Sequence, residues 1–171
     1  MDAPIRVIAW GNKGRSDDGA ALRVLEALRR RLRRGDVALD EYHQLGPELV
    51  EDLARCRLAV FLDAYTGARR AAVVCRRVRA GRHLPMASHH CSPPELLALA
   101  DALGYPVPRA YLVAIRATDF EFGDRLSADT EKACRCAVRH VRRIIAAYDA
   151  GQLDGPRWQR HRSTPGATAM V

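Results

Sequence analysis

The sequence has little lysine, few aromatic residues and no long hydrophobic run. Of the 28 basic residues among 171, only Lys13 and Lys132 are lysines, so 26 are arginines, and aromatic residues make up 6%. No apolar stretch approaches the roughly 18 residues that a membrane-spanning helix requires. The length fits a single domain that buries a shared core. We therefore expect a soluble, single-domain protein.

The cysteines do not form a disulfide pattern. They number five and stand at positions 56, 75, 91, 134 and 136, with no Cys-x-x-Cys pair, and the opening residues MDAPIRVIAW do not resemble a secretory signal. We expect a reduced, cytoplasmic protein that is monomeric. Cys91, two positions after His89, is interpreted as a packed or incidental cysteine rather than as a nucleophile.

The formal net charge of +8 raises the question of an anionic partner. The arginines, however, are spread over several helical segments. The densest run of arginines covers 29–34. Leu28 and Leu32 interrupt the basic sequence at helical spacing, so the arginines are expected to lie on the solvated face of a helix. We therefore expect neither nucleic acid nor a membrane as a partner.

Short apolar runs alternate with helical patterns along the chain. The expected strands cover 5–10, 37–43, 57–64, 71–77 and 109–116, of which all but the second are expected to be buried on both faces, and the expected helices cover 21–32, 46–56, 96–103 and 127–149. This alternation predicts a three-layer α/β/α domain. It would have a mostly parallel, twisted sheet of about five strands, with helices on both faces. The domain is expected to span 1–150, and 151–171 to form a flexible tail.

The segment GNKGRSDDG, residues 11–19, follows the first expected strand. Its glycines do not match the G-x-G-x-x-G spacing of a dinucleotide loop, and Asp17 and Asp18 would repel a phosphate. In one interpretation Ser16 caps the next helix and both aspartates favour the positive end of its dipole. In the other, the loop presents acids to a functional site.

Further polar residues follow other expected strands. Asp63 closes the apolar run LAVFLD, and His89 and His90 precede a helix in ASHHCSPPELL. Ligands of α/β folds gather at the carboxyl ends of the strands. Two carboxylates and one imidazole there can hold a divalent transition metal and leave positions open.

In these motifs the sequence resembles the hydrogenase maturation endopeptidases over about residues 5–148. GNKGRSDDG resembles the family's GN-x4-D-[DE]-G opening, LAVFLDAYTG its strand followed by Asp-Ala, and SHHCSPPELLALADALG its S-[SP]-H-x5-[DE]-LL segment. YLVAIRATDFEFGDRLS is similar to the family's penultimate strand and the loop that follows it. In contrast, YHQLGPELV replaces a frequent Gly-Gly-Thr, and KGRS replaces apolar residues and Arg-Gly.

The resemblance implies a hydrolase that trims the C-terminal extension of a nickel-iron hydrogenase large-subunit precursor. It implies that Asp18, Asp63 and His89 recognise Ni²⁺ already installed in that precursor, so that no permanently bound cofactor is needed. The resemblance also implies a phosphorylase/hydrolase-like fold. Asp18 and Asp63 are the candidate catalytic residues. The nickel is expected to polarise the scissile carbonyl or to lower the pKa of a water, while Asp18 or Asp63 orients that water. The candidate substrate-binding residues are Asn12, His43, Gln44 and His90.

Two other functions remain open at this point. One is a metal-dependent hydrolase of small amides with the same architecture, which would bind its own metal ion. The other is a non-enzymatic module whose basic helix faces bind an acidic partner or nucleic acid, with a steep dependence on salt.

Overall fold

The computed structural model describes residues 4–67, 71–82 and 90–153. In these residues the chain forms one five-stranded sheet with the strand order β2-β1-β3-β5-β4. The strands are β1 (Ile5–Trp10), β2 (Val37–Tyr42), β3 (Leu58–Tyr65), β4 (Val73–Val78) and β5 (Arg109–Arg116). All five were expected from the sequence, within one or two residues at each end.

Four of the strands are parallel. β1 pairs with β2 and β3, and β3 pairs with β5, so these strands all end at the same edge of the sheet, called here the carboxyl edge. β4 pairs antiparallel with β5. The expectation that 71–77 would be buried on both faces was wrong, because five of the six β4 residues are only half-buried. β4 lies at the end of the sheet order and carries two arginines, Arg76 and Arg77.

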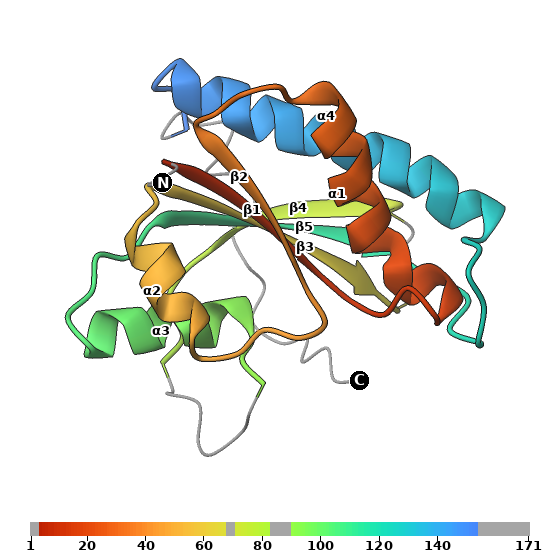
Figure 1. The fold of residues 1–171 in the computed structure, drawn as a ribbon, viewed down its shortest axis with the longest axis horizontal. Coiled ribbons are helices and arrows are strands. Elements are labelled where there is room, and N and C mark those ends of the chain that lie inside the picture. Colours follow the sequence, from red (N-terminus) through yellow and green to blue (C-terminus); the bar gives the residue numbers. More distant parts are fainter. Residues whose placement is uncertain (1–3, 68–70, 83–89, 154–171) are drawn as a thin grey trace.

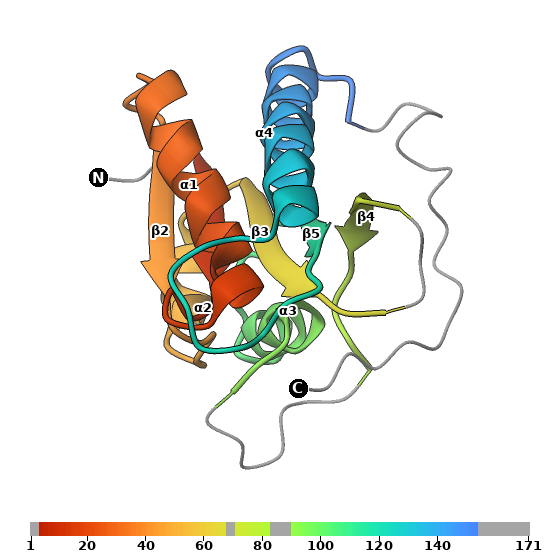
Figure 2. The same cartoon turned by 90° about the vertical axis from the view of Figure 1, so that its right-hand side faces the viewer.

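Helices cover both faces of the sheet (Figures 1 and 2). α1 (Ala20–Arg31) and α4 (Ala128–Asp149) lie on one face, and α2 (Leu49–Ala54) and α3 (Pro93–Ala102) lie on the other. A short 3-10 helix, η1 (Ser16–Gly19), precedes α1 directly. The three-layer α/β/α architecture expected from the sequence is confirmed.

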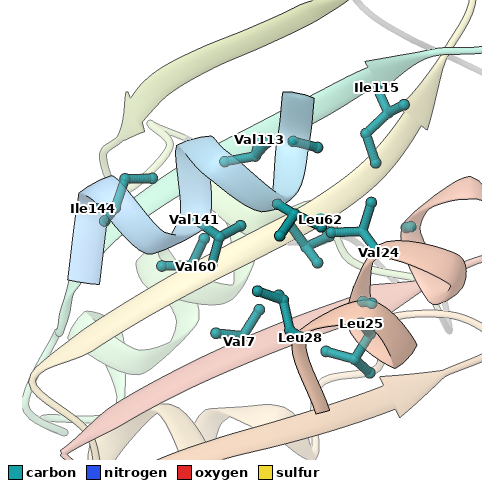
Figure 3. Packing of buried hydrophobic residues seen from close by; sticks show 14 of the residues in the cluster. Val7, Val24, Leu25, Leu28, Val60, Leu62, Val113, Ile115, Val141 and Ile144 are labelled. Atoms are coloured by element: carbon teal, nitrogen blue, oxygen red, sulfur yellow. The ribbon is translucent and has the colours of Figure 1, made fainter. Parts of the chain in front are cut away.

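Each face of the sheet carries its own apolar core. Figure 3 shows the face under α1 and α4, where Leu62 and Val113 of the sheet meet Leu28 of α1 and Val141 of α4, all fully buried. The opposite core lies under α2 and α3 and is centred on Phe61. The apolar spacing of the helices therefore faces the sheet, as an amphipathic pattern predicts.

The start of α4 and the end of the described chain bear on two expectations. Ser127 caps α4, because its hydroxyl accepts a hydrogen bond from the Thr130 N–H, as expected. The predicted tail begins at 151, yet Leu153 is buried and its carbonyl accepts a hydrogen bond of 3.3 Å from the Tyr111 hydroxyl. The rest of that segment, 154–171, lies outside the described residues.

None of the helices in the described residues is both long and apolar enough to cross a bilayer.

Candidate active site

The candidate site lies at the carboxyl edge, where η1, the end of β3 and the loop 117–127 between β5 and α4 come together. Figures 1 and 2 show this loop passing beside the start of α1. Backbone hydrogen bonds join the two segments: the Ser16 N–H donates to the Gly123 carbonyl at 2.9 Å, and the Gly123 N–H donates to the Gly14 carbonyl at 3.0 Å. Residues more than 100 positions apart in sequence thus form one rim.

Gly11 turns the chain out of β1 towards η1. Its φ of +142° lies in a region that favours glycine, and a Cβ atom at this position would overlap the backbone carbonyl of Asp18. The bend that starts at Gly11 therefore depends on the missing side chain. It brings the backbone of η1 back against the end of β1, which places Asp18 at the carboxyl edge.

Asp18 is half-buried at this edge. One carboxylate oxygen, Oδ2, accepts a hydrogen bond of 2.9 Å from the backbone N–H of Asn12. Asn12 itself is fixed by the Gly14 N–H, which donates to its Oδ1 at 2.9 Å. No described residue hydrogen-bonds Oδ1 of Asp18, so this oxygen is available to a ligand.

Asp63 lies near the end of β3, within electrostatic range of Asp18. The pKa of Asp63 is raised from 3.8 to about 7. Burial is the largest cause, a hydrogen bond from the Ala64 backbone opposes the rise, and the nearby Asp18 carboxylate adds to it. None of the described side chains donates a hydrogen bond to the Asp63 carboxylate. Asp63 therefore changes protonation state near neutral pH, as a general acid or base must.

Asp17, adjacent to Asp18, has a different role. The interpretation in which Ser16 caps the helix is wrong: Ser16 lies inside η1 with a φ of +41°, and the N-cap of α1 is Gly19, with no capping side chain. Asp17 is fully buried and its backbone N–H donates to the Asp119 carbonyl at 2.9 Å. Its carboxylate points into the interior, towards the start of α4 rather than the start of α1.

The Asp17 carboxylate accepts hydrogen bonds from the β5–α4 loop and from the first turn of α4. Oδ2 accepts from the backbone N–H groups of Thr118 and Asp119 at 2.9 and 3.0 Å, and Oδ1 accepts from the Ser127 N–H at 2.7 Å. The hydroxyls of Ser127 and Thr130 lie 2.8 Å from Oδ2. Burial raises the pKa of Asp17, but the hydrogen bonds from Thr118, Ser127 and Thr130 outweigh it and lower the pKa to about 2.

The candidate substrate-binding residues lie around the same edge. His43 and Gln44 are exposed and directly follow β2, and exposed His90 precedes α3. The Cys91 N–H donates to the Leu45 carbonyl at 2.8 Å, which joins the segment after Gln44 to the segment after His90. His89, the expected imidazole ligand, lies outside the described residues.

The structure brings together only part of the expected ligand set. In residues 4–67, 71–82 and 90–153, no three or more His, Cys, Asp or Glu side chains are grouped closely enough to hold a metal ion. Within that range, Asp18 and Asp63 are the expected ligands that lie near each other. Burial also raises the pKa of the Cys91 thiol, which does not favour a thiolate nucleophile.

Comparisons of the sequence with protein-family models and with curated proteins found no match. Comparison of the fold did. It is similar to the hydrogenase maturating endopeptidase HybD from E. coli, with a TM-score of 0.65, 22% identity, and coverage of 86% of this chain and 93% of that one. The [NiFe] hydrogenase maturation protease HycI from Thermococcus kodakarensis has a TM-score of 0.66 and 16% identity over 84% and 93% of the two chains. A hydrogenase 2 maturation peptidase from a Thaumarchaeota archaeon has a TM-score of 0.62 and 20% identity over 86% and 98%.

The chain has the fold of the hydrogenase maturation proteases. The resemblance noted in the sequence motifs is thus confirmed at the level of the fold.

One exposed aromatic residue of this hydrogenase-protease fold, Phe122, was not expected from the sequence. Phe122, in the β5–α4 loop, is 89% exposed, although large aromatic side chains are normally packed. The Arg15 guanidinium lies 5.9 Å from the centre of its ring, and the Arg15 Nε donates to the Phe120 carbonyl at 3.3 Å. No pattern in the sequence distinguished this phenylalanine from a core residue, because its exposure follows from the docking of its loop on η1.

We expect Asp17→Asn to destabilise the protein, because an amide nitrogen replaces one acceptor oxygen and faces backbone donors. The loss should be about 2–4 kcal/mol at pH 7 in urea unfolding. The folded-state pKa is below the ordinary value, so the carboxylate stabilises the fold above about pH 4 and this contribution is lost as the pH falls towards 2. The difference between wild type and variant should shrink over that range. An Asp101→Asn variant, changed at an exposed position of α3, should match wild type; equal stability of Asp17→Asn and wild type at pH 7 would contradict this account.

Asp63→Asn should have the opposite effect on stability. The folded-state pKa of Asp63 is raised, so its contribution to stability is greatest below about pH 4 and is lost as the pH rises through about 7. The uncharged variant avoids this loss and should be more stable than wild type by roughly 1–3 kcal/mol at pH 8, with a smaller difference at pH 5. Urea unfolding at both pH values measures it. A variant that is less stable than wild type at pH 8 would show that the Asp63 carboxylate is well solvated or paired.

Proposed function

We propose that this chain is an endopeptidase that removes the C-terminal extension from the large-subunit precursor of a nickel-iron hydrogenase. The fold it shares with proteases of that name supports this proposal. The observation that carries it is the pair of carboxylates at the carboxyl edge: Asp63, half-buried with a pKa of about 7, and Asp18, with one oxygen free of described partners. Such a pair is suited to hydrolysis near neutral pH.

In this proposal the nickel belongs to the substrate. Asp18, Asp63 and His89 would bind the Ni²⁺ of a loaded precursor, since carboxylate and imidazole groups are suitable ligands for that ion. Oδ1 of Asp18 accepts no hydrogen bond from a described residue, and the Asp63 carboxylate accepts none from a described side chain. Both oxygen groups fit this role. A precursor without nickel would lack the group that these residues recognise. Processing would then follow metal insertion.

The hydrolysis requires a proton transfer that Asp63 is suited to perform. Water adds its oxygen to the scissile carbonyl carbon, the carbon–nitrogen bond breaks, and the released amine takes up a proton. The Asp63 carboxylate, deprotonated when it faces the ion, would accept a proton from the attacking water and return it to the amine. Asp18, held by the Asn12 N–H, keeps its position and would orient the water.

The partner and location follow from the same proposal. The precursor subunit is a folded protein, so the surface around Asp18 and Asp63 would be its docking face, with Asn12, His43, Gln44 and His90 at the rim as substrate-binding residues. We propose that the enzyme acts as a monomer in the cytoplasm and keeps no metal of its own between turnovers.

The reaction is tested by the intact mass of a precursor before and after incubation with the protein. A nickel-loaded precursor should lose a short C-terminal peptide, whereas the same precursor without nickel should remain intact. Because Asp63 must lose its proton to bind the ion, the cleavage rate should rise with pH through about 7. Cleavage of both forms at the same rate would contradict recognition through nickel, and cleavage of neither would contradict the proposed substrate.

Variants separate the roles of the site residues. Asp18→Asn and Asp63→Asn should each lower kcat/KM for the loaded precursor by at least about 100-fold. His89→Ala should do the same, whereas His90→Ala should mainly raise KM. Asp101→Asn, with its exposed carboxylate on α3, is the matched control and should retain wild-type activity. Full activity of both site aspartate variants would show that the reaction uses other groups.

We further expect Phe122 to contact the precursor, because its exposed ring lies on a loop that is hydrogen-bonded to η1 beside Asp18. Exposed aromatic residues often contribute much of the binding energy of an interface. Phe122→Ala should raise KM for the precursor by about 10-fold or more and leave kcat nearly unchanged, and Phe122→Trp should restore the affinity. Leu103→Ala removes another exposed apolar side chain, at the end of α3, and should leave KM unaltered. A normal KM for Phe122→Ala would place the precursor elsewhere.

A further inference from the structure

A groove of about 580 Å³ lies between α1 and α4, which run side by side in the same direction over one face of the sheet (Figures 1 and 2). Near the helix starts, the Cys134 thiol donates a hydrogen bond of 3.6 Å to the Ala20 carbonyl, and at the far ends Arg34 pairs with Asp149 at 2.6 Å. The lining extends over 23–31 on the α1 side and 131–142 on the α4 side. At the helical rise this is about 12–16 Å, the length of two to three turns of a further helix.

Arginines form both rims of the groove. Those of α1 stand at 23, 30 and 31, those of α4 stand at 135, 139 and 142, and all six are exposed. Steps of three, four and seven residues keep these side chains on one side of each helix. Like charges at such spacings repel one another, so the arrangement does not stabilise the helices by itself.

The acidic residues of the groove balance part of this charge. The described lining contains two of them, Glu26 and Glu131, and Glu26 pairs with Arg23 at 3.4 Å. Six arginines against two glutamates leave an excess of four positive charges. The segments outside the described residues contain two acidic residues in all, Asp2 and Asp154, which are too few to balance this excess. The groove is therefore electropositive and suited to an acidic ligand.

The floor between the two rims is apolar. Val24, Cys134 and Val138 are buried there, and Ala27 and Leu126 are half-buried. An amphipathic helix can lay an apolar stripe along such a floor. A nucleic acid would use the arginines through its phosphates but not the floor, because its other contacts are base edges and stacked rings. The combination of floor and rims therefore favours a protein helix over a nucleic acid.

We propose that the α1–α4 groove binds an acidic amphipathic helix of a partner protein, with an apolar stripe between two rows of Asp or Glu. The stripe would pack on the floor, and the carboxylates would accept charge-assisted hydrogen bonds from the guanidinium groups of both rims. The proposal does not depend on the proposed protease activity, since neither Asp18 nor Asp63 lines the groove.

A labelled synthetic peptide tests the proposal by fluorescence anisotropy in about 0.15 M salt, an ionic strength that screens diffuse attraction. The peptide has about 20 residues, with leucine along one helical stripe and glutamate on both flanks. It should bind 1:1 with saturation and gain helix content, measured by circular dichroism. A peptide of the same composition in scrambled order should bind at least about 10-fold more weakly. Equal binding of the two peptides would reduce the effect to net charge and overturn the proposal.

Variants locate the binding site on the protein. Arg30→Gln/Arg139→Gln removes one exposed arginine from each rim and should weaken binding of the acidic peptide at least about 10-fold. Arg55→Gln/Arg57→Gln removes the same charge from exposed positions after α2, on the other face of the sheet, and should bind like wild type. An equal loss of affinity in both double variants would overturn the site.

Charge reversal and a competing ligand complete the test. Arg30→Glu/Arg139→Glu should bind a peptide in which lysine replaces each glutamate more tightly than wild type does, because the rims then carry the opposite charge. Duplex DNA at the same salt concentration should bind wild type more weakly than the acidic peptide does. If DNA binds more tightly, and Arg30→Gln/Arg139→Gln abolishes that binding, the groove is a nucleic-acid site and the proposal is wrong.

Discussion

The buried carboxylate of Asp17 holds the candidate site together. It is the one charged side chain in the buried class within the described residues, and its partners come from the β5–α4 loop and the start of α4, more than 100 positions away. A buried charge is tolerated only where hydrogen bonds replace its hydration. Asp17 therefore specifies the position of η1 relative to β5, and with it the position of the adjacent Asp18.

Three aspartates at this edge have different environments and therefore different chemistry. Donors surround Asp17 and lower its pKa, whereas Asp63 has no described side-chain donor and its burial raises its pKa. Asp18 is half-buried, and one of its carboxylate oxygens accepts a hydrogen bond from the Asn12 N–H. In the proposed function, aspartate side chains would thus serve as an anchor, a ligand and a proton-transfer group, according to the hydrogen bonds that reach them.

Much of the fold was predictable from the sequence because the signal is local. Apolar runs marked all five strands, and helical spacing located α1, α3 and α4. The antiparallel direction and half-burial of β4 were not predictable, because they depend on its place at the end of the sheet order. For the site, the apolar strand that ends near Asp63 and the acidic loop after β1 indicated the carboxyl edge, where the structure places Asp18 and Asp63 near each other. The role of Asp17 was missed, since its donors Thr118 and Ser127 are remote in sequence and the local pattern resembled a capped helix.

The account depends most on the difference between the aspartates, which titration of the carboxyl carbons by NMR measures directly in protein with ¹³C-labelled aspartate. It predicts that Asp63 titrates near pH 7 and Asp17 near pH 2, and that Asp18→Asn lowers the pKa of Asp63 because one neighbouring negative charge is removed. If Asp63 instead titrates near 4 and does not respond to Asp18→Asn, the two carboxylates do not form a shared site, and the proposed chemistry at this edge is wrong.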